Sequence, residues 1–552
     1  MLLLLSRASS GGSVLVRRVD RPPGTARPGR DRPRWVWADT SAWYPRLLAD
    51  GVRVERCLDL RLSHHILRSS PRTAASWPAG ALPGPFDGPE PARAGRDDGT
   101  LFGGEEPPQG LDEGACLVEL AAQDRALGGV REAGRLRLLL AAESAGALAA
   151  AEMHHVGVPW DAPTHDAVLS ELLGRRPRAG QRPSRLEELA AVVRRALDAP
   201  GLNPDSTPDV LRALRRVGLP VSSTRRGELE RLVHPAIPPL IEYKKLSRLH
   251  TANGWAWLDQ WVRDGRFRPE YVVGGVVTGR WGSSGGGALQ LPRRLRAAVR
   301  ADEGWRLVVA DAAQLEPRVL AGLARDERLA AAGRGQDLYG AMVAAGVVPE
   351  RAAAKVGMLG ALYGGTTGAS AAVLPRLARA YPDALAYVEA AARAGERGEV
   401  VSTLLGRGSP PPGDAWTHSQ VAALAQGAAA GDEARARSVS RSWGRFTRNF
   451  VVQGTAAEWA LAWIAETRRR LWAMGVTPHA GRAAEPFARR PHLVYFLHDE
   501  LVVHAPAALA PAVADEVRAA AVAAGRLLFG DFPVEFPLSV GIAESYGDAK
   551  GA

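Results

Sequence analysis

Two kinds of hydrophobic pattern alternate along this chain. Between about residues 115 and 270, apolar residues recur every three or four positions between prolines and glycines, which is typical of helices separated by turns. From about residue 271 the pattern changes, and runs such as WRLVVADAAQL and YFLHDELVV are typical of β-strands. The region between these strands, about 327 to 440, is again helical and rich in alanine. The sequence therefore predicts an α+β layer interrupted by a helical insertion.

The first 68 residues have a pattern of their own. MLLLL, SVLVRRVD and RWVWADT predict strands, and the segment that follows predicts a helix, a strand and a second helix. MLLLL is shorter than the roughly 7–15 apolar residues of a secretory leader, so we interpret it as a strand. Residues 69 to 114 are dominated by proline, glycine and charge. Because such a stretch cannot bury enough apolar surface to offset its ordering entropy, we predict a mobile loop there.

Composition limits the class of protein. At 552 residues the chain is long enough for several domains. No apolar run approaches the roughly 18 residues of a membrane span, and two cysteines provide no disulfide framework, so we expect a cytoplasmic protein without membrane contact. Lys and Arg number 70 against 59 Asp and Glu, a net charge of +11. This excess fits a polyanionic partner such as nucleic acid, although arginine is abundant throughout.

An acidic turn separates two of the predicted strands. His498, Asp499 and Glu500 stand where a hairpin usually needs only Asn-Gly or Asp-Gly. Asp311 lies where another predicted strand ends and a helix begins, so both aspartates could face one cleft. Mg²⁺ prefers oxygen ligands and takes one or two protein carboxylates together with substrate phosphates. Taken alone, however, the turn is better explained as an ordinary polar hairpin tip, and aspartates at strand ends are common.

The helical insertion carries a row of four residues at a spacing of four, namely Arg351, Lys355, Leu359 and Tyr363. Four residues turn a helix by roughly 400°, so the four side chains form one slowly drifting row. Two cations at one end suit a triphosphate, and an aromatic ring at the other end suits a base. A solvated basic face beside a core tyrosine has the same pattern, and for the helix taken alone we prefer that interpretation.

Several segments, in order, resemble those of family A DNA polymerases, the bacterial DNA polymerase I group. VVADAAQLEPRVLA, RAAAKVGMLGALYGG and YFLHDELVV resemble motifs A, B and C of that family. VTGRWGSSGGGALQLP resembles its primer–template segment, STLLGRGSPPP the segment after the fingers, and RNFVVQGTAAEWA the glutamine-bearing helix before motif C. LNPDSTPDVLRALRRVGLPV and EYKKLSRL resemble parts of the thumb. The resemblance covers roughly residues 146 to 552 and implies a template-directed DNA polymerase.

The resemblance implies an α+β multidomain protein with a right-hand polymerase fold of palm, fingers and thumb, preceded by a small α/β exonuclease-like domain of the RNase H-like type. The first 68 residues contain no Asp-x-Glu and only Asp59 at a candidate acidic position, so we expect no functional proofreading. The expected regions are an exonuclease-like domain at 1–145 with its loop at 69–114, a thumb at 146–270, a palm at 271–330 and 441–552, and fingers at 331–440.

The resemblance also implies roles for individual residues. Asp311 and Asp499 would bind two Mg²⁺ ions, with Mn²⁺ as an alternative, and Lys355 and Glu500 would assist catalysis. Glu316 stands where the family excludes a ribose 2′-hydroxyl, which favours dNTPs over rNTPs. The other substrate-binding candidates are Arg351 and Lys355 at the triphosphate, Tyr363 beside the templating base, Gln314, Leu359 and His498. The residues expected at primer–template DNA are Arg280, Gln290, Arg407, Arg445, Asn449 and Gln453.

The chain departs from the family pattern at three places in these motifs. Ala312 and Ala313 replace the Tyr-Ser that follows the motif A aspartate, and Pro317 replaces an aliphatic residue. Leu359 stands where an aromatic ring usually stacks on the incoming nucleotide. Since base–aromatic stacking is worth about 1–3 kcal/mol, we expect weaker nucleotide binding or altered sugar selectivity.

We expect a monomeric, nucleoid-associated bacterial enzyme that acts in repair or gap filling. One alternative is a single-subunit RNA polymerase, against which Glu316 argues. The other is a catalytically inactive DNA-binding protein that retains the polymerase fold. The joint presence of two motif aspartates with Arg351 and Lys355 argues against inactivity, because unused charges cost repulsion or desolvation.

Overall fold

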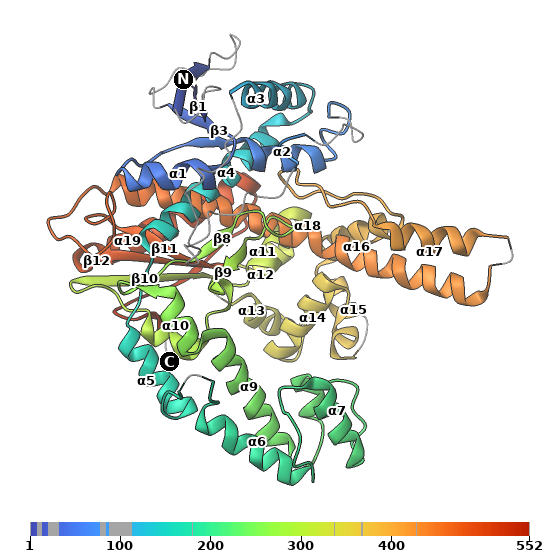
Figure 1. The fold of residues 1–552 in the computed structure, drawn as a ribbon. Helices are drawn as coiled ribbons and strands as arrows, with labels where there is room; N and C mark the ends of the chain where they lie inside the picture. The colour runs from blue at the N-terminus through green and yellow to red at the C-terminus, as the bar shows by residue number, and fades with distance from the viewer. Residues whose placement is uncertain are drawn as a thin grey trace.

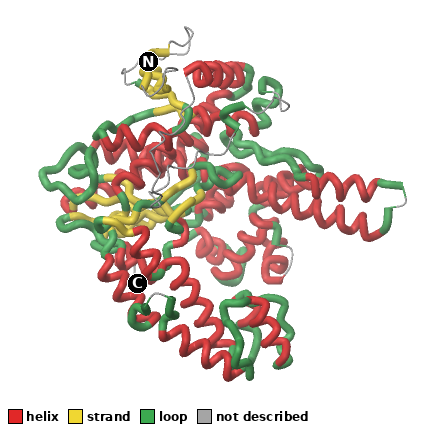
Figure 2. Tube along the Cα trace, in the orientation of Figure 1, coloured by secondary structure: helices red, strands yellow, loops and turns green. Residues whose placement is uncertain are grey.

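The computed structural model describes residues 2–7, 14–19, 33–77, 84–87, 113–178, 180–335, 337–365, 368–426 and 428–550. The elements surround a central sheet, whose strands are the yellow group in the middle of Figure 2. The N-terminal elements lie on one side of this sheet, the helices α5 to α9 lie on the opposite side, and a helical arm projects from the body (Figure 1).

The central sheet is antiparallel and has the order β11-β12-β10-β13. Its register places Asp311 opposite Glu500 and Val308 opposite Val503. Its runs of buried valine and leucine explain why these segments form strands with both faces covered. Helix α19 packs on β10, β12 and β13, whereas α4 and α18 lie against β11. The strands predicted from the sequence are thus confirmed as β10 (Trp305–Ala312), β11 (His492–Leu497), β12 (Glu500–Pro506) and β13 (Leu538–Ala543).

The N-terminal region is a second, mixed sheet, which confirms the predicted α/β region. Its order is β2-β1-β3-β4, with β1 antiparallel to β2 and parallel to β3. Asp59 caps helix α2, since its carboxylate accepts from Leu62 N at 3.0 Å and from Thr40 N and Oγ1 at 2.7 Å each. The elements are β1 (Leu2–Arg7), β2 (Val14–Val19), β3 (Arg34–Trp37), α1 (Thr40–Ala49), β4 (Cys57–Asp59), α2 (Leu60–Ser69) and α3 (Glu113–Gly128).

The loop predicted for residues 69 to 114 lies mostly outside the described residues. The two described pieces within it are anchored to the body. Thr73 and Phe86 are buried, and Asp87 pairs with His64 at 3.0 Å. Ser70 Oγ donates to the carbonyl oxygen of Gly406 at 2.6 Å. Both pieces are turns rather than helix or strand, and each contributes a buried side chain to the body.

The predicted helices of the 115–270 region are confirmed, and those after α4 form the lower part of Figure 1 around separate cores. Ser206 caps α7 by accepting from Asp209 N, as the Ser-Thr-Pro start suggests. The helices are α4 (Ala133–Val156), α5 (Ala162–Leu173), α6 (Ser184–Ala196), α7 (Thr207–Arg216), α8 (Arg226–Leu229), α9 (Ile237–Asn253) and α10 (Trp255–Trp261). The short strands around them are β5 (Val158–Pro159), β6 (Val262–Arg263), β7 (Arg266–Phe267), β8 (Glu270–Val272) and β9 (Gly282–Gly285).

The helical insertion ends in the projecting arm, which consists of α16, α17 and the first half of α18 (Figure 1). Helices α16 and α18 pack closely at Gly395, where an added Cβ would lie 2.1 Å from Thr447 Oγ1. Residues 397 to 413, which we expected to be helical, are an irregular segment. The helices are α11 (Leu315–Ala324), α12 (Glu327–Ala332), α13 (Leu338–Ala344), α14 (Arg351–Tyr363), α15 (Gly368–Ala380), α16 (Pro382–Glu396), α17 (Asp414–Leu424), α18 (Ala430–Ala473), α19 (Ala510–Phe529) and α20 (Tyr546–Ala549).

Three of the predicted domain boundaries fall inside continuous helices. The boundary at 145/146 lies within α4, the boundary at 330/331 lies within the short α12, and the boundary at 440/441 lies within α18. Helix α4 is buried over most of its length and α18 over its second half, so each joins regions that we had expected to be separate. None of the helices in the described ranges is long and apolar enough to cross a bilayer.

Candidate active site

Three carboxylates meet at one end of the central sheet. Asp311 lies near the end of β10, directly opposite Glu500 at the start of β12. Asp499 belongs to the two-residue turn between β11 and β12, and Ala312 N donates to its carbonyl oxygen at 3.0 Å. The preceding residue of the turn, His498, is exposed and has φ 60°, a conformation that non-glycine residues adopt mainly in tight turns. The structure thus brings Asp311 and Asp499 to the same end of the sheet, although only Asp499 lines the neighbouring cavity.

The charges of these acids are only partly compensated. Burial, and then repulsion from Asp311, raises the pKa of Asp499 to about 6. The ammonium of Lys550 lies between the other two carboxylates, 2.6 Å from Asp311 Oδ2 and 2.5 Å from Glu500 Oε2. Sequence reasoning missed Lys550, because one lysine after a short helix carries no local sign of its partners. The carboxylates at this end of the sheet thus already bind a positively charged group, the ammonium of Lys550.

A cavity of about 690 Å³ opens beside the acids. The segment before the central strands, helix α18 and the β11–β12 turn all contribute to its lining. Gln453 is held on this surface, since its Oε1 accepts from Thr278 Oγ1 at 3.0 Å. Five of the residues predicted as site residues line this cavity together, namely Arg280, Gln290, Gln453, His498 and Asp499.

The predicted row on α14 is exposed along its whole length. Arg351 and Lys355 face solvent, and 36 % of Leu359 and 42 % of Tyr363 are exposed, whereas Ala354 and Met358 on the opposite face are buried. A helix with one buried apolar face presents its other face as a continuous surface. The row is therefore available for a ligand from end to end.

Both ends of this row are tied to neighbouring elements. At the first end, Arg351 Nε donates to Asp337 Oδ2 at 2.9 Å, a partner that sequence reasoning missed. At the other end, the Tyr363 hydroxyl donates to Glu316 Oε2 at 2.9 Å, and Arg280 donates to Glu316 Oε1 at 2.5 Å. Burial, and then the charge of Glu316, raises the pKa of Tyr363. Glu316 thus connects α11, α14 and the wall of the cavity.

Helix α18 carries three of the residues predicted to contact DNA, and it lies beside the end of the α14 row and the cavity. Arg445 is exposed and lies over the turn after α14, where a Cβ at Gly364 would come 2.6 Å from Arg445 Cγ. Gly364 has φ 72°, so glycine suits both the conformation and the close approach. Asn449 and Gln453 follow Arg445 at successive turns of α18. The helix therefore connects the end of the α14 row with the cavity.

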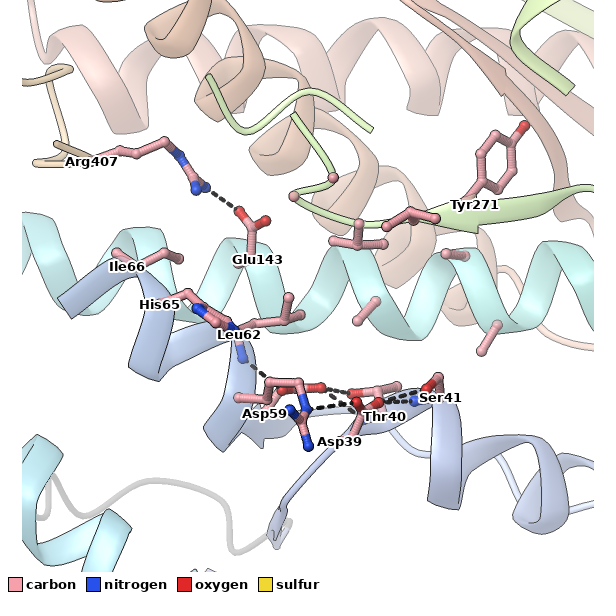
Figure 3. A pocket seen from close by; sticks show the side chains of 18 residues that line it. Asp39, Thr40, Ser41, Asp59, Leu62, His65, Ile66, Glu143, Tyr271 and Arg407 are labelled. Atoms are coloured by element: carbon pink, nitrogen blue, oxygen red, sulfur yellow. Dashed lines mark hydrogen bonds and ion pairs between the residues drawn. The ribbon is translucent and has the colours of Figure 1, made fainter. Parts of the chain in front are cut away.

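Two predicted site residues are engaged elsewhere. Arg407 is buried, and its guanidinium donates to Glu143 Oε2 at 2.6 Å, beside a separate cavity of about 220 Å³ (Figure 3). Gln314 precedes α11 with φ 48°, and its side-chain oxygen accepts from Leu338 N at 3.1 Å. The buried ion pair of Arg407 does not support the expected DNA contact, and Gln314 joins α11 to α13. The sequence could not show the partners of Arg407 and Gln314, because Glu143 is distant in sequence and Leu338 lies on another helix.

Comparison with known proteins identifies the family. Residues 188–548 match the family model described as DNA polymerase family A. The thermostable DNA polymerase I of Thermus aquaticus is 29% identical over 363 residues, which are 59% of this chain and 38% of that protein. DNA polymerase I of Chloroflexus aurantiacus is 28% identical over 324 residues, 54% of this chain and 31% of that protein. The chain thus spans well under half the length of these curated relatives.

A solved structure agrees with this assignment at the level of the fold. The POL domain of Pol1 from M. smegmatis, in complex with DNA primer-template and dNTP, is similar with a TM-score of 0.67 at 20% identity. The match covers 94% of this chain and 87% of that chain. Since the family model alone matches more than half of the sequence, this chain belongs to DNA polymerase family A.

Proposed function

We propose that this chain is a template-directed DNA polymerase that adds dNTPs to a primer 3′ end by two-metal phosphoryl transfer. The observation that carries the proposal is the meeting of Asp311 and Asp499 at one end of the sheet, beside a cavity lined by Arg280 and Gln453. Phosphoryl transfer needs mostly positioning and charge neutralisation, rather than a protein nucleophile. The arrangement supplies carboxylates for cations and a polar surface for a nucleic-acid strand.

The donor set fits divalent cations, Mg²⁺ foremost and Mn²⁺ as an alternative. Asp311 and Asp499 offer the oxygen ligands that Mg²⁺ prefers, and the ammonium of Lys550 already bridges Asp311 and Glu500. Over the described ranges, no three His, Cys, Asp or Glu side chains gather closely enough to hold an ion by themselves. Substrate phosphates and water would therefore complete the coordination. The bound ions would supply activation of the attacking oxygen and stabilisation of the leaving pyrophosphate.

The protein's own groups would hold the nucleotide. Arg351 and Lys355 present two cations to the triphosphate along the exposed side of α14. Glu316, held by Tyr363 and Arg280, would present its carboxylate to the sugar and so disfavour a 2′-hydroxyl. Lys355 is also a candidate proton donor to the leaving pyrophosphate.

We also propose the division into thumb, palm and fingers, with α4 and α18 shared across the boundaries at 145/146 and 440/441. The N-terminal sheet would be an exonuclease-like domain without proofreading. Asp59, its candidate acid, is occupied as a helix cap. A monomeric, nucleoid-associated enzyme of DNA repair or gap filling remains our expectation for the cellular role.

Extension of a labelled primer on a defined template tests the main proposal. The expected result is Mg²⁺-dependent extension with dNTPs and far less with rNTPs. Asp499→Asn should lower the rate about 10³-fold or more, since it removes a charge that the transition state needs, worth roughly 4 kcal/mol. The exposed Asp531 provides the matched control Asp531→Asn, which should extend like the wild type. A protein that binds the primer–template but extends it with neither metal would instead be the inactive DNA-binding alternative.

A further inference from the structure

A second large cavity lies on the other side of helix α18 from the candidate active site. Its volume is about 790 Å³, and it is bounded by β3, the segment before β4, helix α4, the last turns of α18 and the end of α19. At 100° per residue, the positions of α18 that line this cavity point roughly 140° away, on average, from those that line the cavity beside the acids. Helix α18, which runs from the arm across the body, therefore has a separate cavity on each side (Figure 1).

One part of the wall of this second cavity is apolar. Six alanines line it, three on α4 and three on α18, together with Leu138 and Leu527. Alanine side chains leave open the space that larger residues would fill. The volume falls within the roughly 300–1,000 Å³ that small-molecule sites occupy. The cavity therefore has room for a ligand of about the size of a nucleotide.

Positive charge gathers on the rest of the lining. The five arginines that line the cavity are Arg34, Arg53, Arg56, Arg468 and Arg469. The acids on the lining are Glu55 and Glu466, and the buried Glu152 stands behind Arg53 at 3.3 Å and Arg468 at 2.6 Å. Five arginines against these three glutamates leave two positive charges in excess among the described residues. This excess matches the double charge of a phosphate ester better than the single charge of a carboxylate.

Arg53 is held in place and keeps donors for a ligand. Its guanidinium lies 4.3 Å from the ring centre of Trp472, a cation–π contact that fixes it on the wall. Only 5% of its side chain is exposed, and its one hydrogen bond within the described ranges runs from Nη2 to the carbonyl oxygen of Arg468 at 3.4 Å. Burial, which outweighs the attraction of Glu152, lowers the pKa of Arg53 to about 10. A buried cation with unused donors gains from an anion that accepts them.

Arg468 has a different role, because its donors are already occupied. Its Nε donates to Glu152 Oε2 at 2.8 Å, and its Nη1 donates to the carbonyl oxygen of Glu55 at 2.9 Å. Its Nη2 donates to the carbonyl oxygen of Val54. Arg468 therefore fixes the segment before β4 against α18, and so positions Arg53 and Arg56 of that segment around the cavity.

We propose that this cavity binds a phosphate-bearing small molecule of about nucleotide size, with its phosphates on Arg53, Arg56 and Arg469 and its uncharged part against the alanines. Guanidinium groups pair with phosphate through two parallel hydrogen bonds, so three of them on one cavity suit such a group. Several elements bound the cavity, which favours a free small molecule over a nucleic-acid strand. Since the lining joins the N-terminal sheet to α18, a bound ligand also stabilises that junction. The site is separate from the cavity beside the acids and does not depend on the polymerase function.

Isothermal titration calorimetry of ATP into the full chain, in EDTA and without DNA, tests the proposal. Every protein in the series carries Arg351→Gln/Lys355→Gln, which removes the cations proposed to hold a triphosphate on α14. The expected result is one ATP per chain, with adenosine and inorganic pyrophosphate each at least about tenfold weaker, because each lacks part of the contacts. Adding Arg56→Gln/Arg469→Gln should weaken ATP binding roughly tenfold. Adding Ala465→Phe, which fills the cavity without changing its charge, should weaken it by at least about tenfold.

The matched control adds Arg212→Gln/Arg226→Gln to the same starting protein. Both arginines are exposed and, like Arg469, each pairs with an acid three or four residues away. This control should bind ATP like the starting protein. ATP should also raise the Tm of the starting protein and of the control but not that of the Ala465→Phe protein, and the same unfolding curves show that each variant is folded.

Three results would overturn the proposal. The first is that the starting protein does not bind ATP, or binds adenosine or pyrophosphate as tightly as ATP. The second is that ATP binding is unchanged in the two cavity variants. The third is that the control loses as much affinity as they do.

Discussion

Two carboxylates in different regions, Asp59 in the N-terminal sheet and Asp499 in the central sheet, have similar surroundings but different partners. Burial is the largest cause of a raised pKa in both, and a neighbouring aspartate is the second, Asp39 for Asp59 and Asp311 for Asp499. The oxygens of Asp59 accept three hydrogen bonds, from Leu62 N and from Thr40 N and Oγ1. Asp499 lines an open cavity.

This comparison shows that a raised pKa alone does not identify a reactive acid. A buried carboxylate that accepts hydrogen bonds from the N-terminus of a helix and from a neighbouring hydroxyl acts as a structural cap. A carboxylate that lines a cavity beside a second acid is suited to a cation. The hydrogen-bond partners distinguish the two.

The largest expected effect concerns Glu458, a third buried acid, on α18. Burial raises its pKa to about 7, above its usual 4.5, although Thr403 Oγ1 and Leu405 N both donate to its carboxylate. Because the folded-state pKa exceeds the unfolded value, its favourable contribution is complete below pH 4.5 and is lost as the pH rises through 7. Glu458→Gln should therefore raise the free energy of unfolding at pH 8 by up to roughly 3 kcal/mol, with little difference at pH 4. Urea unfolding at the two pH values measures this, and a difference independent of pH would contradict it.

A smaller effect is expected at the structural acid. Asp59→Ala removes the cap of α2 and leaves Thr40 without its acceptor, so it should lower the free energy of unfolding by about 2 kcal/mol. Extension activity per folded molecule should stay within about twofold of the wild type, since Asp59 is outside the candidate site. Asp50→Ala, at an exposed aspartate of the same region, is the control. A large loss of activity in folded Asp59→Ala protein would remove the distinction between the two acids.

A further prediction concerns Lys550, which pairs with two of the acids at the end of the central sheet. Its ammonium neutralises Asp311 and Glu500, so it must compete with a divalent cation for the same oxygens. Lys550→Met should tighten Mn²⁺ binding to the protein about tenfold, which corresponds to about 1.4 kcal/mol. Isothermal titration calorimetry without DNA measures the affinity, and Lys245→Met at an exposed lysine is the control. Unchanged or weaker binding would mean that Lys550 positions the carboxylates for the metal instead.

The smallest effect is expected on α14. Leu359→Phe restores an aromatic face at the half-exposed position where the family usually stacks the incoming nucleotide. Stacking worth about 1 kcal/mol should lower the KM for dNTPs by about fivefold, with little change in kcat. Val356→Phe, at an exposed position of the same helix, should leave KM unchanged. Equal effects of the two variants would show that added apolar surface, rather than stacking, is responsible.

The sequence by itself determined the elements and the order of the motifs. Local periodicity is set by which face of a helix or strand is buried, so β10, β12 and α14 could be predicted from short segments, as could the row from Arg351 to Tyr363 along one side of α14. Asp311 and Asp499 could be named because a carboxylate at a strand end or in a hairpin tip is itself a local signal. The resemblance to family A added residue roles that no periodicity contains.

Only the tertiary structure decided which of these side chains are free. The position of Asp311 opposite Glu500 depends on the register of strands far apart in sequence. The same holds for Lys550 at the acids, for Arg407 in its buried pair with Glu143, and for the cap at Asp59. Hydrogen bonds and ion pairs are short-ranged, and their partners come from any element that packing brings near. The local pattern therefore names the chemical groups, whereas the packing of the chain determines what each group contacts.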